Sequence, residues 1–193
     1  MGNNIEVEGR FRIRDIEEFK RKLVENGATL LKSAEIEDRY YTMKSRDFDN
    51  TIEALRIRTV TGEEGATLTY KGGGNKDSVV MAVPEYETHI DKPEVMESIF
   101  GFIDIVPLGS VKSIRKRRHS YQFGKLKVDL DEFPGFGTFA DIEAIANSES
   151  ETQTAIDEVN AAKERLGIPE EDRITRSIGF LMKEARENGT FKG

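Results

Sequence analysis

Pairs of like-charged residues recur at every second position, mostly with apolar residues between them. The acidic pairs are Glu6/Glu8, Glu85/Glu87, Asp129/Asp131 and Asp141/Glu143, and the basic pairs are Arg56/Arg58 and Arg115/Arg117. Side chains at i and i+2 of a β-strand point to the same face of the sheet. Arg and Lys bind phosphate oxygens, whereas paired carboxylates bind Mg²⁺ or Mn²⁺. The pattern therefore indicates metal-assisted chemistry on a polyphosphate.

A charged strand face can also simply face water, and for any single strand this is the simpler interpretation. Like charges side by side repel one another, however, and here the segregation recurs on strand after strand. The alternative places these faces inside a barrel, where cationic strands oppose anionic ones and helices cover part of the apolar exterior. Such an interior must hold water, because burying many charges is costly.

The elements that would position these pairs follow from periodicity and from turn residues. Alternation predicts strands at 5–14, 53–60, 66–71, 79–90 and 138–146, two more strands within 28–43, and two within 102–131. Pro84 implies a sheet edge or a bulge. Capping residues and helical spacing predict helices near 15–27, 91–100, 150–166 and 174–185. We therefore expect an α+β protein with an antiparallel sheet.

Composition limits the remaining possibilities. The chain has 193 residues, no cysteine, and 29 basic against 36 acidic residues, for a net charge of −7. This length predicts one domain over 1–193, with strands at about 5–146 and helices at about 149–187. Disulfides, thiolate metal sites and cysteine nucleophiles are excluded. The acidic balance and the lack of a long apolar run predict a cytoplasmic protein with no nucleic-acid or membrane partner. A homodimer through apolar outer strand faces is plausible.

The segment Glu6-Val7-Glu8-Gly9-Arg10 resembles the ExExK opening of the CYTH family, which unites class IV adenylyl cyclases and thiamine triphosphatases. Further landmarks of that family follow in its order. They are Arg56-Ile57-Arg58, Thr69-Tyr70-Lys71, Glu85-Tyr86-Glu87, Arg115-Lys116-Arg117 and the stretch from Asp131 to Glu143, which is similar to D-x-V-x-x-L-G-x-F-x-E-x-E. The resemblance covers about residues 5–145. Two departures stand out, because Arg10 replaces the usual lysine and Asp141 the usual glutamate.

The resemblance implies a fold and a set of site residues. The fold would be a closed antiparallel eight-stranded β-barrel, a triphosphate tunnel, with helices packed outside. Glu6, Glu8 and Arg10 would be catalytic. Triphosphate contacts would come from Arg10, Arg56, Arg58, Lys71, Arg115 and Arg117, and metal ligands for Mg²⁺ or Mn²⁺ from Glu6, Glu8, Glu85, Glu87, Asp131, Asp141 and Glu143. Arg115 and Arg117 are chosen because Ile114 would then face the outer core.

Three functions fit this site. The first is a class IV adenylyl cyclase-like conversion of ATP to cyclic AMP and pyrophosphate. It is favoured because Asp38-Arg39-Tyr40-Tyr41 resembles a D-x-Y-F/Y element common in that branch. The second is a triphosphatase acting on thiamine triphosphate or inorganic triphosphate. The third is a non-catalytic module that binds polyphosphate or nucleotide.

Overall fold

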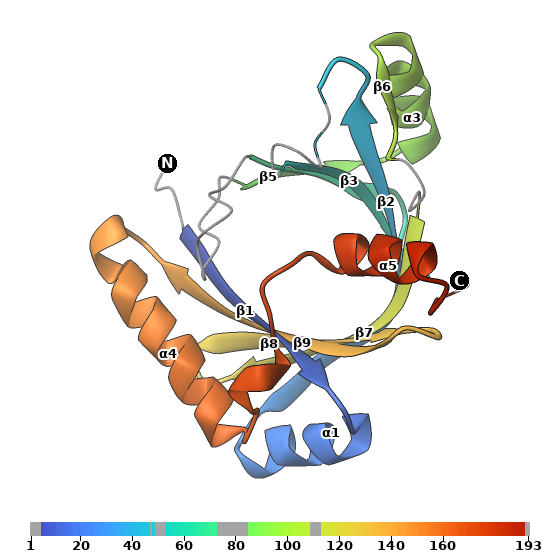
Figure 1. Cartoon of the computed structure of the whole chain (residues 1–193). Coiled ribbons are helices and arrows are strands. Elements are labelled where there is room, and N and C mark those ends of the chain that lie inside the picture. Colours follow the sequence, from blue (N-terminus) through green and yellow to red (C-terminus); the bar gives the residue numbers. More distant parts are fainter. Residues whose placement is uncertain (1–4, 47, 49–52, 73–84, 109–112, 192–193) are drawn as a thin grey trace.

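One strongly curved antiparallel sheet organises the chain (Figure 1). The computed structural model describes residues 5–46, 48, 53–72, 85–108 and 113–191. The strands are β1 (Ile5–Ile13), β2 (Thr29–Met43), β3 (Ala54–Val60), β4 (Ala66–Lys71), β5 (Glu85–Ile90), β6 (Ile105–Pro107), β7 (Ser113–Phe123), β8 (Leu126–Phe133), β9 (Gly137–Ala146) and β10 (Arg173–Ile174). Their order is β10-β1-β9-β8-β7-β2-β3-β4-β5, with β6 beside β2.

The sheet differs from the expected closed barrel of eight strands. It has ten strands, of which β6 and β10 have only three and two residues. Figure 1 shows that the sheet curls until its β1 and β5 ends face each other. In the part of the chain that the structure describes, no backbone ladder joins these two strands, and β10 pairs with β1 only at Arg10 and Phe11. The backbone therefore forms a curled sheet with a gap at this point.

Two smaller differences concern strand boundaries. The segment 28–43 forms the single strand β2, with a bulge between Leu30 and Lys32, rather than two strands. A bulge bends a strand without ending it, so the apolar pattern shifts while the pairing continues. The first part of the strand expected at 79–90, with Pro84, lies outside the described residues, and β5 begins at Glu85.

The helices are α1 (Ile16–Glu25), α3 (Pro93–Phe102), α4 (Thr152–Arg165) and α5 (Ile178–Glu187), with short 3₁₀ turns η1 (Glu149–Glu151) and η2 (Glu170–Asp172). The Asp15 side chain caps α1 by accepting from the Glu18 amide at 2.9 Å. This bond satisfies a donor that the first helical turn leaves free. Among the described residues, no helix is both long and apolar enough to cross a membrane.

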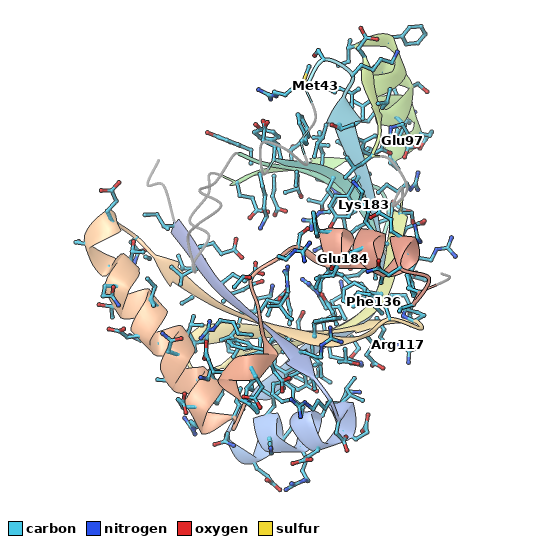
Figure 2. The ribbon with its side chains drawn as sticks, in the orientation of Figure 1. Met43, Glu97, Arg117, Phe136, Lys183 and Glu184 are labelled. Carbon is cyan, nitrogen blue, oxygen red and sulfur yellow. The ribbon has the colours of Figure 1, made fainter. Side chains whose placement is uncertain are left out.

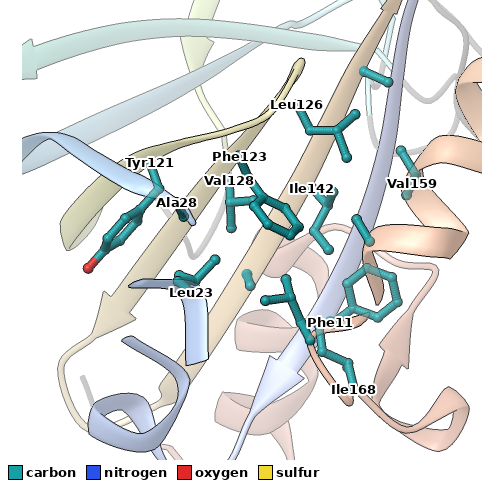
Figure 3. Close-up of a cluster of buried hydrophobic side chains, with 14 of the residues drawn as sticks. Phe11, Leu23, Ala28, Tyr121, Phe123, Leu126, Val128, Ile142, Val159 and Ile168 are labelled. Carbon is teal, nitrogen blue, oxygen red and sulfur yellow. The ribbon is translucent and has the colours of Figure 1, made fainter. Parts of the chain in front are cut away.

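Most of the core lies on the convex side of β1, β9, β8 and β7 (Figure 3). Leu23 of α1 and Val159 of α4 pack there against Phe11, Val128 and Ile142, which are fully buried or nearly so. A second cluster places Phe100 of α3 on the outer face of β2, β3 and β4, against residues such as Tyr41 and Ile57. Strand alternation thus sends one set of side chains into these cores and the opposite set to the concave face.

Helix α5 lies on the concave side, across the curl of the sheet (Figure 1). Its residues Ile178 and Met182 pack against Ile114, Phe133 and Phe139. Phe133 and Phe139 share their strand faces with Asp131 and Asp141, so α5 covers the same face that carries the charges. The expectation that all helices pack outside is therefore wrong for α5, because this end of the concave face is apolar and needs a cover.

Gly9 sits where α4 crosses β1, and a Cβ there would lie 2.8 Å from Val159 Cγ1 and 3.1 Å from the Phe11 ring. Gly9→Ala should lower the free energy of unfolding by about 1–3 kcal/mol, because the crowded core must shift. Urea denaturation measures this change. Gly179→Ala in α5 is the matched control, because its Cβ would lie at an ordinary contact distance of 3.7 Å from Ile114 Cδ1. Its free energy of unfolding should stay the same or rise by up to about 1 kcal/mol, since alanine favours a helix more than glycine does. Equal stabilities of the two variants would contradict this account of the crossing.

Candidate functional site

The concave face carries an extended set of ion pairs, here called the ion-pair network. From β3 through β2 and β7 to β8, strands with inward cations alternate with strands whose inward groups are mainly carboxylates. The members are Glu6, Glu8, Arg10, Asp38, Arg56, Arg58, Lys71, Glu85, Glu87, Lys116, Arg118, Lys127, Asp129, Asp131, Asp141 and Glu143. All the predicted site residues except Arg115 and Arg117 belong to it.

Asp38 connects β2 to its neighbours on both sides. Its side chain is about 1% exposed and accepts two hydrogen bonds from Arg58, at 2.6 and 2.8 Å. Lys116 Nζ lies 3.8 Å from the same carboxylate. Burial alone would raise the pKa of Asp38, but the hydrogen bonds and charge of Arg58 outweigh it, so the pKa lies below its usual value. Asp38 is therefore a fixed anion that holds Arg58 in place.

Arg118 is the cationic centre of the opposite side of the face. It donates to Asp131 at 2.7 and 2.6 Å, donates to Asp129, and lies 3.8 Å from Asp141. Lys116 Nζ also donates to Asp131, at 2.6 Å. Burial lowers the pKa of Lys116 to about 8 despite this carboxylate. The inward cations of β7 are thus Lys116 and Arg118.

The expected inward direction of Arg115 and Arg117 is wrong by one residue. Their side chains are 79% and 59% exposed and pair with Glu37 and Glu35 on the outer surface, and Figure 2 shows Arg117 at the edge of the molecule. The register was chosen so that Ile114 would face the outer core. Ile114 instead contacts α5 on the concave side, and strand alternation then turns Lys116 and Arg118 inward.

Three glutamates form the site best suited to a metal. Glu6 and Glu8 of β1 and Glu143 of β9 each offer an oxygen within 4.8 Å of the other two, and Glu8 lies directly opposite Glu143 in the ladder. Burial raises the pKa of Glu6 to about 8 and that of Glu143 to about 7, and it raises the pKa of Glu8 as well. An all-oxygen donor set suits hard cations such as Mg²⁺ or Mn²⁺, which would replace protons shared by this cluster.

The other predicted metal ligands are already engaged. Asp131 binds Lys116 and Arg118, and Asp141 accepts from Arg10 at 2.6 and 2.9 Å. Although burial acts in the opposite direction, hydrogen bonds from Arg118 hold the pKa of Asp131 well below its usual value. Both aspartates anchor cations, and Asp131 stays ionised. The predicted ligand set therefore divides into the glutamate cluster, two cation anchors, and the pair on β5.

The β5 pair lies across the gap in the sheet. Glu85 is 3.0 Å from Lys71 Nζ, and that nitrogen is 3.9 Å from Glu6 of β1. Glu6 also hydrogen-bonds to Glu85. Glu87 accepts from Thr69 Oγ1 at 2.7 Å. Side chains thus bridge the two ends of the sheet where the backbone ladder stops.

Arg56 offers a donor that the described protein does not use. Its Nη2 donates to Thr69 at 3.1 Å and lies 3.5 Å from Glu87, but its buried Nε has no hydrogen-bond partner among the described residues. A buried donor without an acceptor costs stability. An anion bound on the concave face would satisfy it.

Sequence reasoning missed several members of the network. Asp38 entered only as part of a family element, although its place between Ile36 and Tyr40 on one strand face could have suggested a buried anion. Lys116 and Arg118 have the same i, i+2 spacing as the pair that was chosen. The charge-pair pattern assigns no role to Lys127, which bridges Asp129 and Glu143 at 2.7 and 3.2 Å. For these residues the missing information was the position of α5 and the pairing between distant strands.

Together these features define an α+β protein whose antiparallel sheet curls around a charged interior. A family model described as the CYTH domain matches residues 4–178. A protein of Methanocaldococcus jannaschii named "Putative adenylate cyclase" is 31% identical over 176 residues, which span 90% of this chain and 95% of that protein. The chain belongs to the CYTH family.

Solved structures agree on the fold. A structure from Vibrio parahaemolyticus, described as a "putative adenylate cyclase", has a TM-score of 0.80 at 18% identity and covers 93% of this chain and 98% of its own. The Hippeastrum protein HpAC1 is described as an adenylyl cyclase candidate with a dominant triphosphatase activity. It has a TM-score of 0.64 at 18% identity, with 98% and 97% of the two chains covered.

The raised pKa of Glu143 predicts a pH-dependent stability. A carboxyl group that holds its proton more tightly in the folded state adds stability that is complete below about pH 4.5 and is lost as the pH rises to about 7. Glu143→Gln removes this titration. The fall in unfolding free energy between pH 5 and 7 should then become shallower, by up to about 1.4 kcal/mol per pH unit.

Urea denaturation at several pH values, without divalent metal, measures this slope. Glu149→Gln, on the exposed turn η1, is the matched control and should keep the wild-type slope. A wild-type slope in Glu143→Gln would show that Glu143 does not hold a proton in this range.

Proposed function

We propose that this protein binds a triphosphate and a divalent metal ion on its concave face and catalyses a reaction at phosphorus. The favoured reaction is the adenylyl cyclase-like conversion of ATP to cyclic AMP and pyrophosphate. The observation that carries the proposal is the position of the Glu6/Glu8/Glu143 cluster on the same face as Lys71 and the unsatisfied Arg56 Nε. Together they supply oxygen ligands for a metal and donors for phosphate.

The charge of the ion-pair network explains why metal and triphosphate would bind together. The network contains nine carboxyl groups and seven cations, so its charge is 7 − 9, or −2, when every group is ionised. Without metal, the raised pKa values of Glu6, Glu8 and Glu143 mean that protons on the glutamate cluster offset part of this negative charge near neutral pH. A divalent cation would replace those protons and add positive charge beside the phosphates, and we therefore expect triphosphate binding to depend on metal.

Different residues would bind the phosphate groups and the metal ion. Arg56, Arg58 and Arg118 would bind phosphate oxygens, with the latter two kept in position by Asp38 and by the β8 aspartates. Arg10 donates to Glu8 at 2.6 Å and to Asp141, and it thereby orients a metal ligand. Metal bound by Glu6, Glu8 and Glu143 would activate the attacking oxygen and neutralise charge on the leaving phosphate.

Two reactions share these residues. In the cyclase, the ribose 3′-oxygen attacks the α-phosphorus, its bond to that phosphorus forms, and pyrophosphate leaves. In a triphosphatase, water attacks the terminal phosphorus, the bond from that phosphorus to the bridging oxygen breaks, the diphosphate leaves, and the attacked group is released as orthophosphate. The relative named as an adenylate cyclase supports the first reaction, and the activity described for the Hippeastrum protein supports the second as the alternative.

An activity panel tests the proposal. Purified protein is incubated with ATP, thiamine triphosphate or tripolyphosphate, each with Mg²⁺, with Mn²⁺ or with EDTA. Cyclic AMP with pyrophosphate identifies the cyclase, and orthophosphate identifies the triphosphatase. Metal-dependent binding with no product would identify a non-catalytic module. If none of the triphosphates binds or reacts with either metal, the proposed function is wrong.

The glutamate cluster has its own test. Glu6→Gln/Glu8→Gln should abolish metal-dependent turnover and the rise in melting temperature caused by Mn²⁺, because only one ligand of the cluster remains ionisable. Glu17→Gln/Glu18→Gln, on the exposed side of α1, is the matched control and should retain both. Turnover that survives in the cluster variant would exclude these two residues as metal ligands.

The two faces of the sheet can be distinguished by paired arginine variants. Arg56→Ala should raise the dissociation constant for tripolyphosphate at least about tenfold in the presence of metal, since a charge-assisted hydrogen bond contributes about 1.5–3 kcal/mol. Arg115→Ala removes a cation from the outer face. This variant should change the dissociation constant for tripolyphosphate less than about twofold at moderate salt. Isothermal titration calorimetry measures both, and equal losses would argue against binding on the concave face.

A further inference from the structure

Lys127 of β8 connects the glutamate cluster to a buried aspartate. Its Nζ donates to Glu143 at 3.2 Å and to Asp129 at 2.7 Å, and Lys127 lies directly opposite Glu143 in the ladder between β8 and β9. Although burial acts in the opposite direction, the charges of these two carboxylates raise the pKa of Lys127, so it stays a cation. A metal ion on the cluster would therefore have to share Glu143 with an ammonium group.

Lys127 is also the most exposed of the three cations that form ion pairs with the glutamate cluster in the described part of the chain. Its side chain is 43% exposed, against 30% for Lys71 and 21% for Arg10. Lys71 is further held by Glu85, and Arg10 by two hydrogen bonds to Asp141. A lysine carries a point charge on a flexible four-carbon stem. Lys127 can therefore turn away from the cluster while the other two cations stay in place.

Movement of Lys127 would leave neither of its carboxylates without a partner. Asp129 is fully buried, but it also accepts hydrogen bonds from the Ser120 hydroxyl and from Arg118. The charge of Glu143 would be compensated by the metal ion that takes the place of the ammonium group. Breaking an ion pair is costly mainly because it strands a buried charge, and that cost is absent here.

We propose that Lys127 exchanges Glu143 for an oxygen of the triphosphate when metal binds, an inference that rests on the proposed function of the concave face. Without metal, Lys127 competes with the metal ion for Glu143, because a divalent ion and an ammonium group at one carboxylate repel each other. Mg²⁺ and Mn²⁺ usually bind carboxylates together with substrate phosphates, so the freed ammonium group would meet a phosphate oxygen beside Glu143. Lys127 thereby makes metal bind weakly alone and more tightly with triphosphate.

Lys127→Met tests the proposal because its two expected effects have opposite signs. Without triphosphate, the affinity for Mn²⁺ should rise at least about fivefold, since a repelling charge is gone. The electron paramagnetic resonance signal of free Mn²⁺ measures this at pH 8, where fewer protons compete for the cluster. With saturating Mn²⁺, the dissociation constant for tripolyphosphate, measured by isothermal titration calorimetry, should rise at least about fivefold, because a charge-assisted contact is lost. General damage to the site would weaken both interactions.

Two further variants serve as controls. Lys125→Met removes the same charge from the exposed turn between β7 and β8, and it should change either dissociation constant less than about twofold at moderate salt. Lys127→Arg keeps the cation and should show no rise in Mn²⁺ affinity.

The results separate this inference from the proposed function. Lys127→Met protein whose Mn²⁺ affinity is unchanged or lower overturns the proposal, and so does unchanged binding of tripolyphosphate. In both cases a wild-type protein that binds Mn²⁺ and tripolyphosphate leaves the proposed function standing. A wild-type protein that binds neither ligand contradicts the proposed function, and this inference with it.

Discussion

The cross-strand contacts of Arg118 show the constraint that the rest of the structure obeys. A sheet that buries charges on its concave face must bring an opposite charge within reach of each one, because an unpaired charge in a partly buried position is far more costly than a paired one. Arg118 meets Asp129 and Asp131 on β8, the strand beside β7, and lies 3.8 Å from Asp141 on β9, one strand further along the sheet. Strand order, register and the inward faces of β8 and β9 all have to agree for that cation to be compensated.

The same ion pairs complete the curl of the sheet. Among the described residues the backbone ladder ends at β5, yet Lys71 reaches both Glu85 and, on the far edge, Glu6. Side-chain electrostatics therefore act across the gap that backbone hydrogen bonds leave. Because Glu6 is also part of the glutamate cluster, metal binding and the approach of β1 to β5 involve the same carboxylate. If a metal ion displaced the proton of Glu6, the hydrogen bond between Glu6 and Glu85 would change as well.

Much of this arrangement could be predicted from period-two charge pairs. Glu6, Glu8, Arg56, Arg58 and Glu143 lie on the concave face as their alternation indicated. The predicted direction of the basic side chains on β7 was wrong because Ile114 could pack on either face of the sheet. Only the position of α5 determines which face Ile114 takes. The division of the acidic residues into cation anchors and a glutamate cluster also needed the fold, since it depends on pairing between strands far apart in the sequence. The predicted closure of the barrel was not confirmed for a similar reason. Alternation indicates the sheet face on which a side chain lies, but it does not indicate where the hydrogen bonding between strands ends.

The two departures from the family pattern turn out to be one structural feature. Arg10 and Asp141 are directly opposite each other in the ladder between β1 and β9, and they form a two-point hydrogen-bonded pair. An arginine is longer and more planar than a lysine, and an aspartate is one methylene shorter than a glutamate, so the pair fills a similar space with a more rigid geometry. The third contact of Arg10, with Glu8, transmits that rigidity to the glutamate cluster. Considered together, the two substitutions preserve the charges of the site while fixing Glu8, a proposed metal ligand, more firmly.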